Sequence, residues 1–209
     1  KTANALVINF GKLPEHIFAT GNVLTGGTST ATGIVQSTPA VKGWQAVSSA
    51  GSPTMTGVSQ VRFESFNLGT PKFVLIDGVN PAATYDGTTY TQITDTYAPT
   101  NPSLAAVYQN QLFLAGDPAE PQNLYHSLPY DETNFDVNLG GFVLNVGFKI
   151  VQLKVFRNVL YIFGENNIKS LEGTSRSDWV VRTVTSNLGC IAPDSVAEFN
   201  GEIVFLAPD

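Results

Sequence analysis

Few residues in this chain have the side-chain chemistry of a catalytic or metal centre. Cys190 is the one cysteine, and His16 and His126 are the two histidines. A cysteine nucleophile needs a base beside it, and neither histidine lies in a recognisable motif. A metal site would need further His, Cys or clustered carboxylate ligands. We therefore interpret Cys190 as a small buried core residue, and His126, within a predicted strand, as a polar strand or interface residue.

The acidic side chains lie in predicted turns. Segments 116–122 and 130–136 carry oxygen ligands of the kind that bind Ca²⁺, but neither has the spacing of an EF-hand loop. We interpret both as solvated turns, and an ion shared at a subunit contact is the alternative. Glycoside hydrolysis would need two carboxylates about 5–10 Å apart. The candidate acids, which nothing in the sequence pairs, are Asp77, Asp86, Asp117 and Glu120.

The motifs of the common enzyme classes are missing from the sequence. It contains no phosphate-binding P-loop and no G-x-G-x-x-G, G-x-S-x-G or H-E-x-x-H pattern. The sequence thus predicts no catalytic, cofactor-binding or metal-binding residue, and we expect neither enzyme activity nor a cofactor.

The composition narrows the possible partners. Of the 209 residues 43% are hydrophobic, yet only 13% are charged, which is about half the ~25% of a typical soluble domain. A net charge of −6 without any basic run disfavours binding to a nucleic-acid backbone. No apolar stretch approaches the ~20 residues of a membrane span, and one cysteine allows no intrachain disulfide. The low charge fits a surface covered by neighbouring subunits, or simply a Thr/Ser-coated β domain.

A hydrophobic hairpin phrase recurs along the chain. It reads KFVLIDG (72–78), QLFLAGD (111–117), VLYIFGEN (159–166) and EIVFLAPD (202–209). The copies, anchored on Phe73, Leu112, Leu160 and Ile203, are spaced by 39, 48 and 43 residues. That period is typical of a β-propeller in which each repeat is one four-stranded blade.

Turn residues between the strand segments support this reading. Asn110 and the pairs Asp86–Gly87, Arg157–Asn158 and Asn200–Gly201 lie where hairpins should turn. No segment has helical periodicity over 11 or more residues. The aromatic residues on predicted strands, which we expect to pack in the core, include Tyr108, Phe113, Tyr125, Phe156, Tyr161 and Phe163.

We therefore predict an all-β, propeller-like array of four-stranded blades, with a β-sandwich as the alternative. The blades are expected at about 58–95, 103–138, 150–185 and 194 onward, and residues 133–138 should form the last strand of the second blade. Residues 1–57 are rich in Gly, Thr and Ser and predict an irregular arm or platform segment. Because the chain starts at Lys1 and stops within a strand phrase, we expect it to be incomplete at both ends.

Several phrases together resemble the tail nozzle, or tail-hub, family of bacteriophage virion proteins. FVLIDGVNPAATYDGTTYTQIT (73–94) is similar to that family's hydrophobic strand followed by N-G-x-x-P and YDGTTW, with Asp77 for the Asn and Tyr90 for the Trp. LAAVYQNQLFLAGDPAEPQNLYHSLPYDETNFD (104–136) and the stretch from residue 150 to 209, with SNLGCIAPDSV (186–196) inside it, resemble two further family segments. The resemblance covers roughly residues 58–209.

The resemblance implies a structural component of the virion. Members of this family form rings, commonly hexameric, around the axial channel of a short tail. The implied partners are other copies of the chain, the adaptor or portal-proximal layer and other tail proteins, with transient, non-specific passage of the phage DNA and a host surface receptor as a further partner. Two other functions stay open: a receptor- or carbohydrate-binding protein of the tail tip, and a polysaccharide-degrading enzyme.

Overall fold

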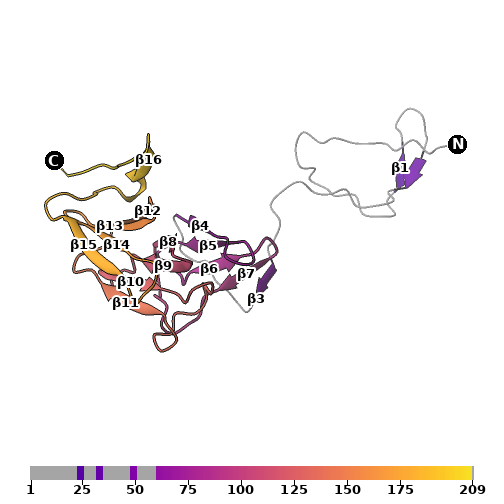
Figure 1. Ribbon diagram of the computed structural model, residues 1–209. Coiled ribbons are helices and arrows are strands. Elements are labelled where there is room, and N and C mark those ends of the chain that lie inside the picture. The colour runs from indigo at the N-terminus through magenta and orange to yellow at the C-terminus, as the bar shows by residue number, and fades with distance from the viewer. Residues whose placement is uncertain (1–22, 26–31, 35–47, 51–59, 209) are drawn as a thin grey trace. The chain divides into compact units, whose positions relative to one another are not determined.

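The computed structural model describes residues 23–25, 32–34, 48–50 and 60–208. Contacts divide the chain into two units, Lys1–Ala46 and Val47–Asp209 (Figure 1). In the first unit, β1 (Val23–Thr25) and β2 (Thr32–Ile34) form an antiparallel pair. Most of the arm expected at 1–57, including His16, lies outside the described residues.

The second unit is all-β, as the sequence predicts. Its first sheet is an antiparallel meander of β4 (Arg62–Phe66), β5 (Lys72–Ile76), β6 (Ala83–Tyr85) and β7 (Thr89–Gln92). The short strand β3 (Ser48–Ala50) adds to the outer strand β7 in parallel. The two units thus divide before β3, upstream of the boundary at residue 57 that composition suggests.

Two further four-stranded meanders and a hairpin follow in chain order. The second sheet comprises β8 (Leu104–Tyr108), β9 (Gln111–Ala115), β10 (Asn123–His126) and β11 (Phe142–Asn145). The third comprises β12 (Gln152–Phe156), β13 (Val159–Phe163), β14 (Ile168–Glu172) and β15 (Val180–Thr185). The hairpin pairs β16 (Ala197–Phe199) with β17 (Glu202–Val204).

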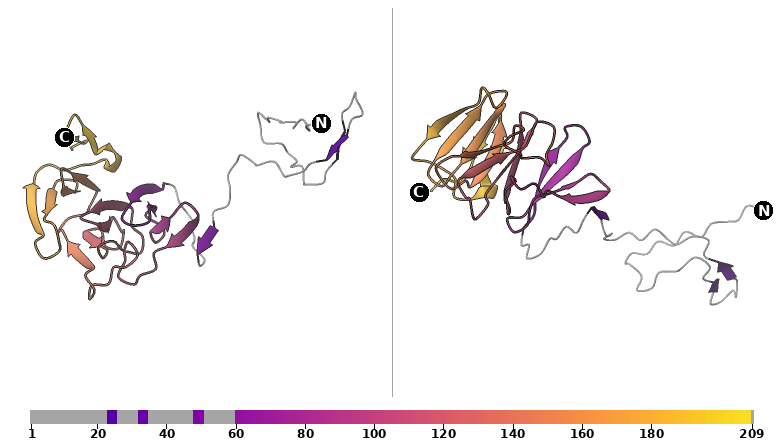
Figure 2. Two further views of the ribbon diagram at one scale, coloured as in Figure 1. Left: turned by 45° about the vertical axis from the view of Figure 1, so that its right-hand side comes forward. Right: turned by 90° about the horizontal axis from the view of Figure 1, so that it is seen from below.

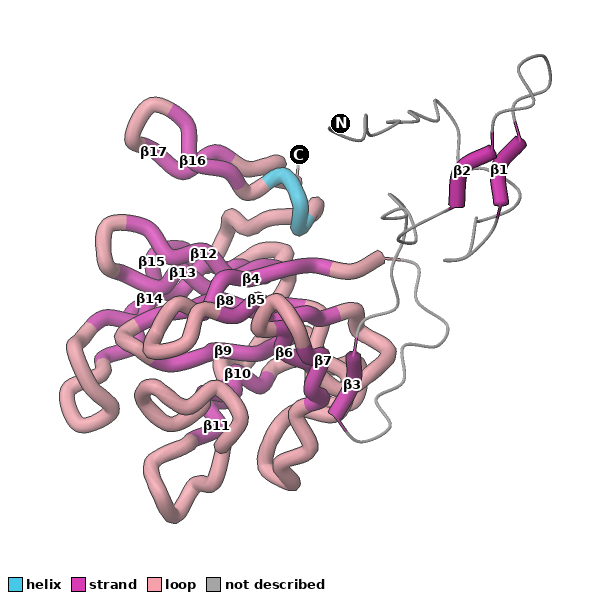
Figure 3. The backbone as a smooth tube through the Cα atoms, turned by 90° about the vertical axis from the view of Figure 1, so that its right-hand side faces the viewer, coloured by secondary structure: helices cyan, strands magenta, loops and turns pink. Residues whose placement is uncertain are grey.

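Helical structure is minimal in the described part of the chain. It consists of one 3₁₀ turn, η1 (Pro193–Ser195), which Figure 3 shows in cyan before β16. No helix among the described residues has the length and apolarity to cross a membrane.

The prediction that residues 133–138 form the last strand of the second sheet is wrong. Residues 133–138 form a loop, and the outer strand is β11 instead. Side chains within the loop accept hydrogen bonds from its backbone N–H groups. Asn134 Oδ1 accepts the N–H of Asp136 at 3.0 Å, and Asp136 Oδ1 accepts that of Asn138 at 2.8 Å. Such local hydrogen bonds compete with a sheet ladder. Phe135 is buried in the core, so its apolar character serves the core without any strand.

The turns between the first two strands of successive sheets share one backbone conformation. Both central residues have positive φ at Gln109–Asn110 (48° and 62°), Arg157–Asn158 (48° and 60°) and Asn200–Gly201 (50° and 76°). A type I′ turn requires this conformation, and its twist matches that of the flanking strands. The turn positions expected from the sequence are confirmed here, whereas β4 and β5 are joined by a longer loop.

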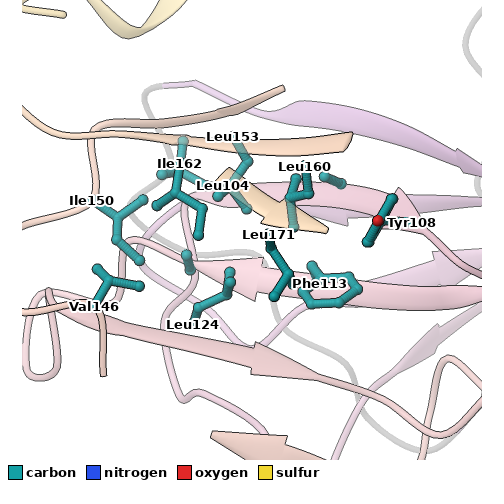
Figure 4. Close-up of a cluster of buried hydrophobic side chains, with 12 residues drawn as sticks. Leu104, Tyr108, Phe113, Leu124, Val146, Ile150, Leu153, Leu160, Ile162 and Leu171 are labelled. Atoms are coloured by element: carbon teal, nitrogen blue, oxygen red, sulfur yellow. The ribbon is translucent and has the colours of Figure 1, made fainter. Parts of the chain in front are cut away.

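The sheets stack through their apolar faces. Side chains at alternate positions of β8 face opposite ways, so Ala105 and Val107 contact the cluster shared with the first sheet, while Leu104 and Ala106 belong to the cluster shared with the third. The cluster between the second and third sheets also includes Leu160 and Ile162 of β13, as Figure 4 shows. The first strands lie side by side, because β8 contacts both β4 and β12, and Figure 2 shows the three sheets next to one another.

The expected core aromatics are found at these interfaces. Tyr108, Phe113 and Phe163 are buried, and Tyr125 and Tyr161 pack against the clusters. Phe156 is partly buried, with the Arg157 guanidinium 4.9 Å from its ring centroid.

Candidate functional site

The residues with catalytic potential are separated in the structure. Cys190 is fully buried and packs with Phe163 and Ile168 between the third sheet and the final hairpin. Its thiol lies 3.0 Å from the Ala192 carbonyl oxygen. His126 lies elsewhere, where it lines a hollow between the second and third sheets. The thiol is therefore placed as the core residue that the sequence predicts.

The acidic turns use their carboxylates to hold backbone. Asp77 and Asp86 each accept two N–H groups of the turn that follows, at 2.8–2.9 Å. The two hydrogen bonds to Asp86, from the N–H groups of Thr88 and Thr89, together with one from the Thr88 hydroxyl, lower the pKa of Asp86 to about 2. The carboxylate of Asp117 accepts the N–H groups of Ala119 and Asn101. Each of these acids thus accepts hydrogen bonds from backbone N–H groups of its own turn, and Asp117 also holds the loop at Asn101.

The two acidic segments of the second sheet do not converge on an ion site. Glu132 is buried and forms an ion pair with Lys72 of the first sheet. The N–H of Phe135 donates to Asp95 Oδ2 at 3.0 Å, a second link to the first sheet. Across the described ranges, no three His, Cys, Asp or Glu side chains gather as metal ligands would. The loop at 130–136 therefore acts as a clasp between two sheets.

A polar cluster joins β4 and β12, the first strands of the first and third sheets, to the segment before the final hairpin. The Arg62 guanidinium on β4 donates to both carboxylate oxygens of Asp194 in η1, at 2.9–3.1 Å. Gln60 donates to the same carboxylate at 3.2 Å, and Gln152 on β12 donates to the Pro193 carbonyl at 2.9 Å. The hydrogen bonds from Gln60 and Arg62 lower the pKa of Asp194. Residues far apart in sequence thus fasten η1 across β4 and β12.

A second charged residue on β4, Glu64, has a shifted pKa. Burial raises the pKa of Glu64 on β4, and the positive charge of Lys154 on β12 opposes that rise. Sequence reasoning missed this cluster, because nothing in the order of residues relates Arg62 to Asp194, which is 132 positions away.

One face of the first sheet is apolar and open. In the register of β4 and β5, Phe63 lies opposite Leu75 and Phe73 lies opposite Ser65, so the four side chains share a face. The second sheet covers the other face. Phe63 is 64% exposed and Phe73 is 52% exposed. Large apolar side chains that are exposed together mark interaction surfaces, and we call this the open face.

An open groove lies at one end of the second and third sheets. It has a volume of about 600 Å³, and amide or hydroxyl side chains that line it include Gln109, Asn110, Gln111, Thr174, Ser175 and Ser177. The carboxylate of Asp178 holds the loop at 174–175 through its N–H and hydroxyl groups. These hydrogen bonds lower the pKa of Asp178 well below its usual range.

Comparison with known proteins adds no relative: no protein-family model and no curated protein matches this chain.

Proposed function

We propose that this chain is a structural subunit of a bacteriophage tail, a component of the nozzle or hub ring that walls the channel for genome ejection. The observation that carries the proposal is the succession of three four-stranded meanders, stacked in chain order with their first strands side by side. The subunit acts through assembly and stiffness, and no residue performs bond chemistry.

The stacking supports a propeller-like arrangement over a β-sandwich. A sandwich has two sheets that face each other, whereas here the middle sheet is covered on both faces by neighbouring sheets. Propeller blades radiate around a channel, so one strand of each blade lies nearest the axis. On this proposal β4, β8 and β12 take that position. The contacts of β8 with β4 and β12 support it, as does the η1 segment, which bridges β4 and β12.

The phrases that resemble the nozzle family coincide with these elements. Residues 73–94 run from β5 to just beyond β7, and residues 104–136 run from β8 through the clasp loop. Residues 150–209 span the third sheet and the final hairpin. The resemblance therefore follows the structural repeat, and a net charge of −6 agrees in sign with a channel wall that does not hold DNA phosphates.

The open face supplies a surface for a second copy of the chain. A sheet face that exposes Phe63 and Phe73 is costly to leave in water, since each Phe side chain contributes about 1.5–3 kcal/mol when it is fully buried. The chain is poor in charge, as the cores of subunit interfaces are. We assign the open face to the contact between neighbouring subunits of the ring.

The test is the oligomeric mass of the purified protein by light scattering, with negative-stain imaging. Closed rings with an axial hole wide enough for duplex DNA are the expected result. Phe73→Lys should reduce rings to monomers without a loss of folded structure, because Lys on the open face opposes burial there. Thr183→Lys, on the exposed strand β15, is the matched control and should leave rings intact. A monomer under all conditions, including with neighbouring tail proteins added, would overturn the proposal.

The groove beside the Gln109–Asn110 turn favours a second function, recognition of a host carbohydrate receptor. Amide and hydroxyl groups are the partners that sugar hydroxyls need. Binding of the protein to a glycan array, abolished by Asn110→Asp together with Ser177→Ala, would favour this function. A blank array alongside ring formation would favour the conduit.

A further inference from the structure

The hollow that contains His126 is a small apolar pocket between the second and third sheets. It has a volume of about 200 Å³. Its carbon-only lining side chains come from β9, β10, β11, β14 and β15, and they are Phe113, Leu124, Phe142, Leu144, Leu171 and Val181. An engineered apolar cavity of about 150 Å³ is known to bind benzene. The hollow is therefore large enough for one aromatic ring.

His126 lines this hollow. The side chain is 2% exposed, and burial lowers its pKa to about 4, so the ring is neutral at pH 7. Nδ1 lies 3.1 Å from both the Gln111 amide nitrogen and the Ser127 carbonyl oxygen. The Gln111 amide already donates one hydrogen to that carbonyl at 2.7 Å, which leaves its second hydrogen for Nδ1. We assign the ring proton to Nε2 on this basis, and Nε2 has no hydrogen-bond partner among the described residues.

Trp179 presents a second buried donor. Its Nε1 atom is inaccessible and lacks an acceptor in the described part of the chain. The Trp179 and His126 ring centroids are 4.7 Å apart, with the planes at 82°, so the two donors belong to neighbouring rings. A buried donor without a partner costs about 1–3 kcal/mol. Both rings line the hollow, so two nitrogen atoms without a partner among the described residues lie on its border.

Arg176 adds a positive charge to the same lining. Its guanidinium carbon lies 4.5 Å from the Phe142 ring centroid, and Nη1 donates to the Gly141 carbonyl at 3.2 Å. This leaves the rest of the planar guanidinium, with its several N–H groups, to meet a carboxylate. The Arg176 side chain lines the hollow beside His126.

We propose that this hollow binds a small single-ring aromatic carboxylate. The ring lies among the apolar side chains, the carboxylate oxygens accept from His126 Nε2 and Trp179 Nε1, and Arg176 balances the charge. A hexose is a poorer match, because the hydroxyls around its ring need more polar partners than these three side chains provide. The proposal does not depend on ring assembly, and the hollow shares Arg176 with the groove beside the Gln109–Asn110 turn.

The test uses benzoate as the probe and the indole N–H resonance of Trp179 as the readout, in the ¹⁵N-labelled full chain. Trp179→Phe assigns that resonance, because Trp44 is the other tryptophan. We expect benzoate to shift it saturably, and toluene, which lacks oxygen atoms, to bind at least about tenfold more weakly, a difference of ~1.4 kcal/mol.

Two variants and a control locate the site. Arg176→Gln should weaken benzoate binding by about tenfold, as expected for a lost charge-assisted hydrogen bond, and Leu144→Trp should abolish it by filling the hollow. Arg182→Gln is the matched control, since Arg182 pairs with Glu172 and does not line the hollow. Absence of a saturable shift, equal affinity for toluene, or unchanged binding in Arg176→Gln would each overturn the proposal. Circular dichroism verifies that each variant is folded.

Discussion

Two equivalent positions of the repeat have opposite environments. Tyr108 ends β8 just before the Gln109–Asn110 turn and is 2% exposed, with its hydroxyl donating to the Gly173 carbonyl at 2.9 Å. Phe199 ends β16 just before the Asn200–Gly201 turn and is 72% exposed. The local sequence and the turn conformation are alike. The difference is the neighbour, because a complete sheet covers Tyr108, whereas no sheet in the described part of the chain covers Phe199.

The same contrast separates the two interfaces as a whole. The interface of the second and third sheets buries an extensive apolar cluster. The interface of the third sheet and the hairpin buries only Phe163, Ile168 and Cys190 among the described residues, with partly buried neighbours. Stability should therefore be unevenly distributed, with the hairpin as the part that opens most readily.

The largest expected effect is a cavity at the anchor of the third sheet. Leu160→Ala should lower the free energy of unfolding by about 3 kcal/mol, since Leu160 is fully buried. Ile203→Ala, at the equivalent anchor of the hairpin, should lower it by about 1 kcal/mol or less, because Ile203 is only partly buried. Urea unfolding measures both. Equal losses would show that the two interfaces do not differ in strength.

Acid should weaken the second and third sheets through His126. Its pKa of about 4 lies below the ~6.5 of an unfolded histidine, so the unfolded chain binds more protons between these values and stability falls as the pH falls. Between pH 7.5 and 5.5 the loss should be about 1.4 kcal/mol. Urea unfolding at both pH values measures it. His126→Gln should remove this dependence, whereas the control His16→Gln should retain it.

A turn substitution should cost less and should sharpen the comparison. Asn110→Ala should lower the free energy of unfolding by about 1 kcal/mol, because alanine tolerates a φ of 62° less well than asparagine does. Asn110→Gly is the control and should be close to neutral. At the hairpin, Gly201→Ala should speed amide exchange of β16 and β17 alone. Loss of global stability in Gly201→Ala would contradict the independence of the hairpin.

The smallest effect is expected at the polar cluster that fastens η1. Asp194→Asn should lower the free energy of unfolding by about 0.5 kcal/mol, as for an exposed ion pair. The change should also speed amide exchange of Ile191, whose N–H donates to the Leu206 carbonyl. Arg182→Gln, at another exposed pair, is the control and should leave that exchange unaltered. High salt should mimic the Asp194 variant, since it screens exposed charges.

The strand and turn pattern was predictable because its causes are local. Alternating apolar residues and the turn residues Asn110, Asn158 and Gly201 define hairpins within a few positions, and the structure has them there. The prediction failed at 133–138, where Phe135 reads as part of a strand. Its place in the core depends on contacts with the first sheet, through Asp95 and the neighbouring Glu132–Lys72 pair.

By itself, the sequence determined an all-β unit, its hairpins and the buried place of Cys190. Only the tertiary structure decided which sheet covers which, and with it three features: the Arg62–Asp194 link, the exposed Phe63 and the paired donors of His126 and Trp179. The physical reason is range. Backbone conformation and side-chain alternation act between near neighbours in the chain, whereas burial, desolvation and charge pairing depend on residues brought together from distant segments.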